Sequence, residues 1–367
     1  MSSPPTILFQ PLNHIGLGHV NRLASIALAL RRLDPCIRTL FVVEGGAHVL
    51  LDSLGLPYLP LPSEHAMHET DSWSSWTASE RSSFSSQISR AILGTVLPQI
   101  VVFDCVPNPA FAAATFEAAL PAVLCLREMR DLDAYLAFMR ESLPHLNLIL
   151  VPHDPGAFDL PEPLREKAHF VGEIARPFAP APAGHRNPAC PRIGISGGGG
   201  GYPGTIDFYN LATAAISKLR AEYPTCEVRL IAGPLFRDWD RLSLQTGLRV
   251  IPFESDMPAV FASADLVICQ AGYNTIAEIQ QVGTKAILVP AERLWDNQFA
   301  RADRASRLHP HIRVLRSADP AALAHLASQL LREPDPARAL EVARPPGAAR
   351  AAALLHALLL PQQSSPK

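Results

Sequence analysis

A histidine follows a short glycine-rich segment near the start of the chain, where it could act as a base. Gly16 and Gly18 precede His19, and an apolar helical period begins at Val20. Glycines let a ligand approach the backbone closely, and the positive end of a helix disfavours an imidazolium. We therefore expect His19 to be neutral and able to accept a proton. The alternative is that His19 only caps the turn.

An aspartate stands at the end of a predicted strand, Ile100–Asp104. A carboxylate beside a histidine orients the ring, as in the base–carboxylate pairs of many enzymes. We expect Asp104 to orient His19 in this way. A helix-capping role for Asp104 is the alternative, because Pro107 and Pro109 follow closely.

A second glycine segment, five residues long, lies between a predicted strand and a long predicted helix. Backbone N–H groups that precede a helix are suited to binding an anion such as a diphosphate. Each glycine costs conformational entropy, so the run favours a binding loop over a flexible turn. It is not a Walker A loop, because no G-K-[ST] follows. The candidate residues are Ser196, Gly197, Gly198, Gly199 and Gly200, with Gly201 completing the run.

A third segment, residues 263–283, reads as a strand, a tight glycine turn, a helix and a glycine stop. Its N–H groups could again bind phosphate at the start of the helix, and Glu278, near the first turn, is placed for a pair of ribose hydroxyls. Six residues past Pro290, more polar side chains open the next predicted helix. The candidates are Gln270, Gly272, Tyr273, Asn274, Thr275 and Glu278, followed by Asp296, Asn297 and Gln298.

The elements that must position these residues alternate between strands and helices, which indicates an α/β fold with parallel sheets and helices on both faces. In the first half, strands are predicted at Thr6–Gln10, Thr39–Val43, Ile100–Asp104, Ala122–Leu126 and Leu148–Val151, with helices such as Val20–Leu33 and Pro109–Ala119. In the second half, strands are predicted at Arg192–Ser196, Glu227–Ala232, Leu248–Ile251, Leu266–Cys269 and Lys285–Val289, and helices at Thr205–Glu222, Asn274–Val282 and Trp295–Arg307.

The length of 367 residues suggests two domains. Residues 176–192 are rich in proline and alanine and lack an apolar period, which is typical of a semi-rigid linker. We predict a first domain at 1–176, a linker at 177–191, a second domain at 192–360 and a disordered tail at 361–367. The polar segment Ser63–Ser89 contains Trp73 and Trp76 and is interpreted as a long loop plus a helix. It favours an acceptor surface, with a plain mobile loop as the alternative.

Composition limits the partners. The formal net charge of −2 provides no basic field for nucleic acid or an anionic membrane. No run approaches the roughly 18 apolar residues of a membrane span. We expect reduced cysteines and a cytoplasmic protein, and contact with the periphery of the inner membrane face stays open, as does the oligomeric state. Two D-x-D matches, Asp131–Asp133 and Asp238–Asp240, are interpreted as solvated charges, so no metal site is predicted.

The stretch Ala264–Pro290, followed by Asp296-Asn297-Gln298, resembles the donor-binding signature of family 28 glycosyltransferases, whose best-known member is MurG. The resemblance spans nearly the whole chain and includes His19, Gly172–Arg176 and Gly197–Gly201. The motif QAGYNT and the segment Leu126–Asp131 are more similar to uncharacterised bacterial predicted glycosyltransferases than to MurG itself. Where the family has G-G-x-G-G-H, this chain has H-I-G-L-G-H. The resemblance implies the GT-B fold: two Rossmann-like parallel-sheet domains facing a cleft, with an acceptor-binding first domain and a nucleotide-sugar-binding second domain.

The resemblance also implies roles for single residues. Gly197–Gly201 and Gly272–Thr275 would hold the diphosphate, with Arg176 as an added cation. The segment with Phe253 and Met257 would meet the nucleobase, Glu278 the ribose, and Asp296, Asn297 and Gln298 the sugar hydroxyls. His19 would be the general base. The implied reaction is an inverting, metal-independent transfer of a hexose or N-acetylhexosamine from a UDP- or TDP-sugar to an acceptor hydroxyl. The nucleotide sugar is a co-substrate, and no cofactor is expected; the acceptor is a small molecule, a lipid-linked sugar or a peptide.

Three other functions stay open. A nucleotide-sugar hydrolase or epimerase would use the same donor loops without an acceptor groove. An NAD(P)-dependent oxidoreductase would use the G-x-G-x-x-N of Gly16–Asn21 with Glu44 as the ribose acid, but it leaves Gly197–Gly201 unexplained. A non-catalytic binding subunit would carry the nucleotide sugar for a partner.

Overall fold

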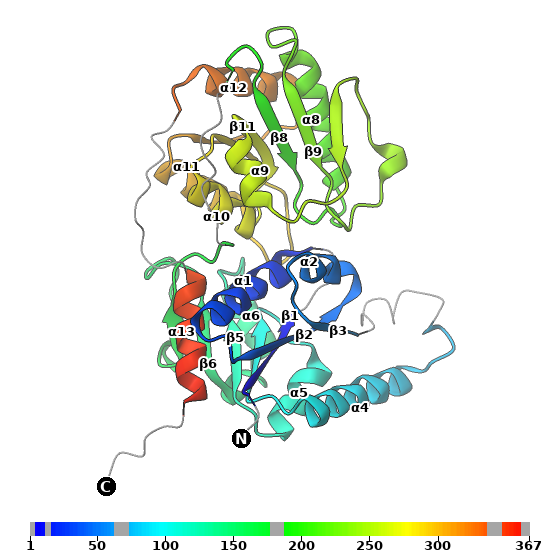
Figure 1. Ribbon diagram of the computed structural model, residues 1–367, viewed down its shortest axis with the longest axis vertical. Helices are drawn as coiled ribbons and strands as arrows, with labels where there is room; N and C mark the ends of the chain where they lie inside the picture. The colour runs from blue at the N-terminus through cyan, green and yellow to red at the C-terminus, as the bar shows by residue number, and fades with distance from the viewer. Residues whose placement is uncertain (1–3, 12–15, 62–72, 177–186, 336–346, 361–367) are drawn as a thin grey trace. The chain divides into compact units, whose positions relative to one another are not determined.

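The computed structural model describes residues 4–11, 16–61, 73–176, 187–335 and 347–360, and they form two compact units, each built on one parallel sheet (Figure 1). The predicted α/β class with two parallel-sheet domains is confirmed. The predicted tail, residues 361–367, and most of the predicted linker lie outside the described residues. Residues 187–191 form a turn that leads into the second sheet.

The first unit contains a seven-stranded sheet in the order β3-β2-β1-β4-β5-β6-β7, with every neighbouring pair parallel. The strands are β1 (Thr6–Pro11), β2 (Arg38–Glu44), β3 (Tyr58–Leu61), β4 (Ile100–Asp104), β5 (Ala122–Cys125), β6 (Leu146–Val151) and β7 (Ala168–Phe170). The helices are α1 (Gly18–Leu33), α2 (His48–Ser53), α4 (Ala78–Val96), α5 (Pro109–Glu117), α6 (Leu132–Met139), α7 (Glu162–Arg165) and α13 (Gly347–Leu359), with short 3-10 turns at Gly45–Ala47 and Leu143–His145.

The second unit repeats this plan with a six-stranded sheet in the order β10-β9-β8-β11-β12-β13. The strands are β8 (Arg192–Ser196), β9 (Glu227–Ile231), β10 (Leu248–Ile251), β11 (Leu266–Gln270), β12 (Ala286–Val289) and β13 (Ile312–Val314). The helices are α8 (Thr205–Leu219), α9 (Met257–Ser263), α10 (Tyr273–Val282), α11 (Gln298–Leu308) and α12 (Pro320–Arg332), with a 3-10 turn at Trp239–Arg241.

The central strands are buried on both faces, which explains their continuous apolar sequences. β1 and β4 contain no exposed residue, as expected of a parallel sheet covered by helices on both sides. In each sheet the order of strands reverses between the first strand of the unit and the fourth. Ligands of open α/β sheets bind at this reversal, at the carboxyl ends of the strands. The fold therefore places candidate sites after β1 and β4 and after β8 and β11.

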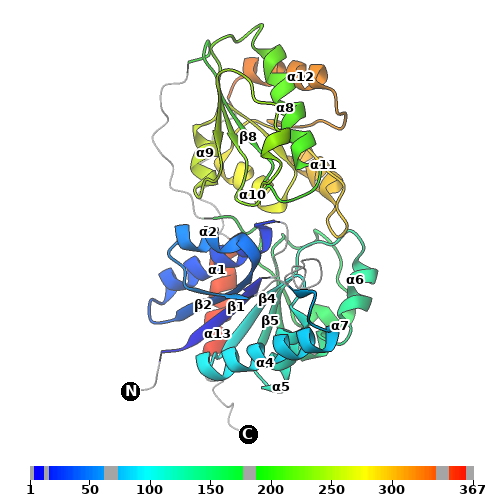
Figure 2. The same cartoon turned by 90° about the vertical axis from the view of Figure 1, so that its right-hand side faces the viewer.

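The last helix corrects the predicted domain boundary at residue 360. Helix α13 belongs to the first unit and not to the second (Figure 2). The Gly347 N–H donates to the Glu173 carbonyl at 3.2 Å, and Arg350 Nη1 donates to the Val171 carbonyl at 2.9 Å. A Cβ at Gly347 would lie 2.8 Å from the Glu173 carbonyl carbon, so only glycine allows this approach. The apolar face of α13 is buried, but its sequence does not say which sheet it covers.

Three short strands were absent from the prediction: β3, β7 and β13. Each has three or four residues and lies at an edge of its sheet. So short a segment shows too few alternations to separate a strand from a loop. In the predicted segment Ser63–Ser89, the helix exists as the start of α4, which has a capping box between Thr77 and Glu80; residues 62–72 lie outside the described part.

Candidate functional site

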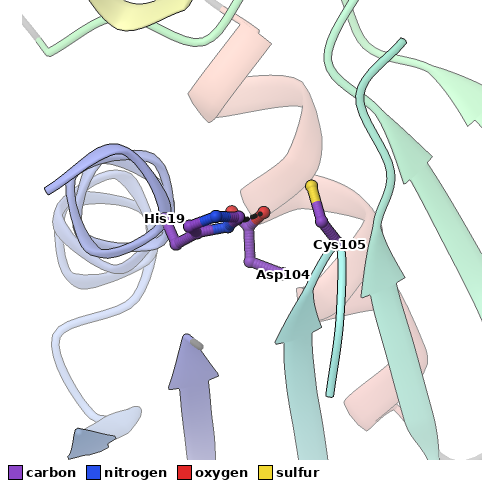
Figure 3. A group of neighbouring side chains, drawn as sticks. All are labelled: His19, Asp104 and Cys105. Atoms are coloured by element: carbon purple, nitrogen blue, oxygen red, sulfur yellow. Dashed lines mark hydrogen bonds and ion pairs between the residues drawn. The ribbon is translucent and has the colours of Figure 1, made fainter. Parts of the chain in front are cut away.

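His19 and Asp104 meet at the reversal point of the first sheet. Strands β1 and β4 are paired so that Pro11 lies opposite Asp104, which is the last residue of β4. Helix α1 follows β1 in the chain, and His19 is the second residue of this helix. His19 Nδ1 lies 3.1 Å from Asp104 Oδ1 (Figure 3). Asp104 is fully buried, whereas 29% of the His19 side chain is exposed, so the pair has one sheltered partner and one that solvent reaches.

The pKa of His19 corrects the expectation of a neutral ring. Burial lowers this pKa, but the hydrogen bond to Asp104, followed by the contact with Cys105, outweighs burial and raises the pKa to about 9. Burial likewise opposes the charge of Asp104, but Arg22 and then His19 hold the pKa of this carboxyl well below its usual range. The expectation considered only the helix end and missed the stronger field of a buried carboxylate at 3.1 Å.

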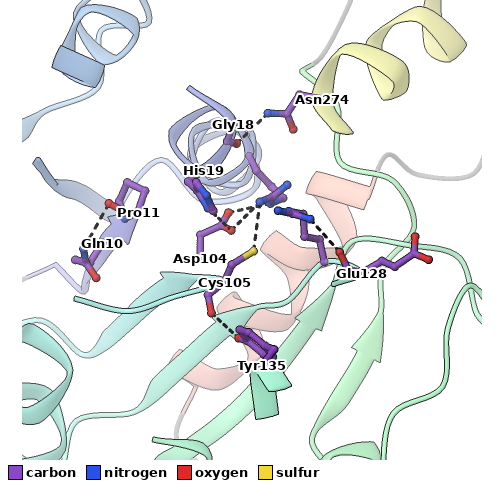
Figure 4. Close-up of polar contacts among 11 residues, drawn as sticks. Gln10, Pro11, Gly18, His19, Asp104, Cys105, Glu128, Tyr135 and Asn274 are labelled. Carbon is purple, nitrogen blue, oxygen red and sulfur yellow. Dashed lines mark hydrogen bonds and ion pairs between the residues drawn. The ribbon is translucent and has the colours of Figure 1, made fainter. Parts of the chain in front are cut away.

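Arg22 is a third member of this group and was missed from the sequence. Arg22 Nε donates to Asp104 Oδ2 at 2.8 Å, and Arg22 Nη2 donates to Asp104 Oδ1 at 2.7 Å. Figure 4 shows the Asp104 carboxylate with dashed lines for its polar contacts. Its side chain is 2% exposed. The signal available in the sequence was its spacing: His19 and Arg22 are three residues apart, which puts them on one face of a helix.

The turn after β4 fixes the aspartate. Cys105 has a φ of 56°, in the left-handed region that residues other than glycine rarely adopt. The Val106 N–H donates to the Asp104 carbonyl at 2.7 Å, and the Tyr135 hydroxyl donates to the Cys105 carbonyl at 2.5 Å. Strained backbone of this kind persists only where the surroundings hold it. The capping alternative for Asp104 is wrong, since Asn108 caps α5.

His19, Asp104 and Cys105 lie close enough together to be considered as metal ligands, within 4.8 Å of one another. Arg22, however, donates to both oxygens of Asp104, and its Nη2 lies 3.6 Å from Cys105 Sγ. A guanidinium in this position repels a cation and occupies the lone pairs that it would need. This arrangement favours a base–carboxylate pair over a metal site.

The glycine loop of the second unit follows β8 and is held firmly. The Gly197 N–H donates to the Tyr209 hydroxyl at 3.0 Å, and the Gly198 N–H donates to Ser196 Oγ at 3.3 Å. Gly198 and Gly200 have φ values of 75° and 86°. Helix α8 begins at Thr205, as predicted, so three residues separate the glycine run from the first turn of that helix. The glycines of the loop are required at least partly by backbone shape.

We predict different costs for two alanine substitutions in this loop. Gly198→Ala lowers the free energy of unfolding by about 1–2 kcal/mol, because the positive φ is strained while no atom lies within 4 Å of the new Cβ. Gly200→Ala costs a further ~1–3 kcal/mol, because its Cβ would lie 2.9 Å from the Phe236 nitrogen. Urea unfolding measures both, and equal stability of the two variants would contradict this packing.

The neighbouring strand β11 ends at Gln270 and leads into α10. The Gly272 N–H donates to the Gln270 carbonyl at 2.9 Å, and Gly272 is the N-cap of the helix without a side-chain cap. Tyr273 is buried, and Asn274 and Thr275 are half-buried in the first turn. The N–H groups of this first turn have no intrahelical acceptor, which suits them to phosphate. The structure therefore brings the predicted residues of the third segment to the reversal point of the second sheet.

Arg293, in the connection between β12 and α11, was also missed from the sequence. Its guanidinium carbon lies 3.8 Å from the centre of the Tyr202 ring, and Nη2 donates to Gln270 Oε1 at 3.0 Å. Burial lowers the pKa of Arg293. Because Tyr202 follows the glycine run directly, Arg293 places a positive charge between that run and the end of β11.

Arg176 and Glu278, predicted for diphosphate and ribose, contact each other. Arg176 Nε donates to Glu278 Oε1 at 3.2 Å, and its Nη1 donates to the Ser255 carbonyl. The two side chains are 8% and 4% exposed. Glu278 is the sixth residue of α10 and lies just past its first turn. The pair fixes Glu278 in place before any ligand arrives.

We predict that Glu278→Ala lowers the free energy of unfolding by about 3–5 kcal/mol, because it leaves the buried Arg176 without its carboxylate. The matched control is Glu117→Ala, which breaks the 3.0 Å pair with Arg90 where both side chains are 56% exposed; it should cost less than about 1 kcal/mol. Denaturant unfolding compares the two. A loss as small as in the control would show that the Arg176–Glu278 pair is open in solution.

The polar triplet before α11 is engaged within the unit. Asp296 forms an ion pair with Arg301, Asn297 Oδ1 caps the helix by accepting from the Ala300 N–H at 3.0 Å, and Gln298 Oε1 accepts from the Ala291 N–H at 3.0 Å. The helix therefore begins at Gln298, three residues after the predicted start. These contacts fix the side chains at the carboxyl end of β12, next to β11.

The remaining predicted residues occupy the expected segments. Phe253 is half-buried between β10 and α9, and Met257 is the first residue of α9. Gly18 is the first residue of α1, and Gly16 lies two residues before it; neither has a positive φ. Of the D-x-D matches, Asp131 caps α6 and Asp238 pairs with Arg241.

Comparison with known protein families gives a match within the second unit. Residues 200–331 match the model of the glycosyltransferase family 28 C-terminal domain. The second unit carries a family 28 domain. The match begins within the glycine run and ends in α12, so it contains the first turn of α10 and the polar triplet before α11.

The chain is also similar to curated N-acetylglucosamine transferases, at about 30% sequence identity over part of its length. The chain is 29% identical over 233 residues to the UDP-N-acetylglucosamine--N-acetylmuramyl-(pentapeptide) pyrophosphoryl-undecaprenol N-acetylglucosamine transferase of Bradyrhizobium diazoefficiens, an alignment that covers 59% of each chain. The first curated relatives are covered over 34% to 59% of their own length, so the chain spans about six tenths of them or less.

Solved structures show the fold of the whole chain. The glycotransferase of kitacinnamycin superposes with a TM-score of 0.66 at 16% identity, over 97% of this chain and 100% of that one. A putative UDP-N-acetylglucosamine 2-epimerase from Listeria monocytogenes gives a TM-score of 0.62 at 13% identity, over 96% and 95%. The chain has the GT-B fold, with the family 28 domain as its second half. In the described part, no helix combines the length and the apolar character needed to span a membrane.

Proposed function

We propose that the protein is an inverting glycosyltransferase that moves a hexose or N-acetylhexosamine from a UDP- or TDP-sugar to an acceptor hydroxyl, with His19 as the general base. The observation that carries the proposal is the His19–Asp104 contact at 3.1 Å in a chain whose second half is a family 28 domain. A base for the acceptor and a domain for the donor are the two parts that such a reaction needs.

The contact with Asp104 selects the tautomer of His19. Because the buried carboxylate accepts from Nδ1, the neutral ring has its lone pair on Nε2. Because the pKa of His19 is about 9, the neutral ring is the minor form at pH 7. In the proposed step Nε2 of this neutral form takes the proton of the acceptor hydroxyl as its oxygen attacks the anomeric carbon. The bond from that carbon to the diphosphate oxygen breaks, and the nucleoside diphosphate leaves with the electron pair. One displacement of this kind inverts the configuration.

The second unit, which carries the family 28 domain, supplies the groups proposed for the donor. Gly197–Gly201 and the first turn of α10 would stabilise charge on the departing diphosphate, since N–H groups held in advance act without reorganisation. Glu278, held by Arg176, would meet the ribose, and the Asp296–Gln298 triplet would meet the sugar. The segment of Phe253 and Met257 would contact the nucleobase. Neither Mg²⁺ nor a cofactor is part of this proposal.

The names of the curated relatives support UDP as the carrier, because those proteins take N-acetylglucosamine from UDP. Their acceptor is linked to undecaprenol, so an acceptor attached to lipid and contact with the inner membrane face belong to the proposal. We also propose a location in the cytoplasm. The acceptor class stays broad and includes small molecules and peptides.

The test is incubation with UDP- and TDP-sugars and a set of hydroxyl-bearing acceptors, with EDTA present, followed by mass spectrometry and NMR of the product. The expected product is a glycoside whose anomeric configuration is opposite to that of the donor. Free sugar without glycoside would indicate the hydrolase alternative, and an altered but still nucleotide-linked sugar would indicate the epimerase alternative. A product that retains the donor configuration would contradict the single displacement.

A further inference from the structure

The ion pair between Arg22 and Asp104 is fully buried, in contrast to most ion pairs on protein surfaces. Both side chains are at most 2% exposed, and buried pairs contribute little to stability, because desolvation cancels most of their attraction. We therefore ask how this ion pair affects the orientation and the charge of the side chain that it contacts. That side chain is His19, which shares Asp104 Oδ1 with Arg22 Nη2.

The geometry of the fork orients the carboxylate. Arg22 uses two different nitrogens, Nε and Nη2, on two different oxygens at 2.8 and 2.7 Å. Two parallel hydrogen bonds from a planar guanidinium prevent the carboxylate from rotating. Oδ1 therefore stays directed at His19 Nδ1. A lysine ammonium, a point charge on a flexible stem, lacks this fixed fork.

The charges lead to a second consequence. When His19 is neutral, Arg22 balances the charge of Asp104, and the group as a whole is neutral. Without Arg22, the imidazolium of His19 would be the remaining cation against the buried carboxylate among the residues that the structure describes. Arg22 thus allows His19 to lose its proton without leaving an unpaired charge inside the protein.

We propose that Arg22 is a positioning residue of the reaction: its fork on Asp104 holds the carboxylate toward His19 Nδ1 and frees His19 from the need to carry the balancing charge. This inference rests on the proposed function for its catalytic meaning, but the effect of Arg22 on His19 can be measured without any substrate.

The groups that face His19 come from several elements. Asp104 and Cys105 come from the end of β4, and Arg22 from α1 itself. Behind them, Cys125 at the end of β5 and Tyr135 on α6 both have pKa values raised by burial, so these two groups stay uncharged where His19 titrates. Arg22 is therefore the group whose removal changes the charge beside the pair.

The test compares Arg22→Met and Arg22→Lys with the control Arg31→Met, an exposed arginine on the same helix. Ring-nitrogen NMR of labelled histidine follows His19 with pH, with the signal assigned by its absence in His19→Gln. In Arg22→Met we expect the pKa of His19 to rise by about one unit or more, since the carboxylate is no longer shared. Arg22→Lys keeps the charge and should leave this pKa near the wild-type value, with the Nδ1–H tautomer less dominant. Arg31→Met should change neither.

The pH dependence of kcat/KM gives the matching kinetic result. The acidic limb of Arg22→Met should move up by the same amount, giving at least about tenfold lower kcat/KM at pH 7 and recovery at high pH. A structural defect would lower the rate equally at every pH.

An unmoved or lowered pKa of His19 in Arg22→Met overturns the proposal. If Arg22→Met does not fold, Arg22→Lys provides the test. A wild-type tautomer ratio and a wild-type rate in Arg22→Lys would contradict the positioning role of the two hydrogen bonds from Arg22 to Asp104. The NMR shift without any sugar transfer would contradict the proposed function and leave the role of Arg22 standing.

Discussion

Replacing His19 with glutamine should lower kcat by about 10²–10⁴-fold, the usual contribution of a positioned base, and leave the dissociation constant of the nucleoside diphosphate unchanged. Glutamine keeps a polar group of similar length but cannot accept the proton of an acceptor hydroxyl at neutral pH. We propose that the donor binds to the second unit, which carries the family 28 domain, whereas His19 lies in the first unit, so binding and turnover should separate.

Steady-state kinetics and calorimetric titration of UDP measure the two effects on one protein sample. The control is His325→Gln, an exposed histidine on α12, which should change neither quantity. Equal turnover of His19→Gln and wild type would remove His19 from the mechanism. A loss of nucleotide binding equal to the loss of turnover would make His19 a ligand of the donor instead of a base.

Asp104→Asn should combine a similar loss of kcat with a loss of stability that His19→Gln does not share. The amide no longer balances Arg22, which is buried to 2% exposure, and breaking a buried ion pair costs about 3–5 kcal/mol. The double variant Asp104→Asn with Arg22→Met removes both charges and should recover part of that stability. Failure of the double variant to recover any of it would contradict the unpaired arginine as the cause.

The stability difference between wild type and Asp104→Asn should depend on pH. The contribution of Asp104, whose pKa is depressed in the fold, is present above its ordinary value of 3.8 and is lost as the pH falls. The contribution of His19, whose pKa is raised, is complete below 6.5 and is lost as the pH rises through about 9. The difference should therefore be largest between about pH 4 and 6.5. Denaturant unfolding at several pH values measures it, and a difference that keeps growing up to pH 9 would contradict the sign.

The sequence predicted the buried strands and the site segments because their signals are local. β4, β8 and β10 begin and end where their apolar runs predict, and the glycine segments lie after β8 and β11 because glycine punctuates such turns. The His19–Asp104 contact was also predicted, and the structure confirms it at 3.1 Å. Eighty-five residues separate the two, but both follow strands that are neighbours in the sheet.

What the sequence did not predict depends on long-range partners. Arg22 appeared to be one more charge on a helix, and only the fold shows that it lies inside the protein against Asp104. The Arg176–Glu278 contact joins residues 102 positions apart, and the pKa of His19 depends on the burial of its partner. Helix α13 has an apolar face that either unit could cover, so its place in the first unit required the structure.

A calorimetric titration of the intact protein with UDP, TDP, GDP and NAD, each with Mg²⁺ and with EDTA, tests directly whether the protein binds a nucleoside diphosphate. We expect saturable binding of UDP or TDP that EDTA does not weaken and that Gly200→Ala reduces. The same ligand should raise the melting temperature by mass action. Binding of NAD without binding of any nucleoside diphosphate would contradict the account and return attention to the segment from Gly16 to Asn21.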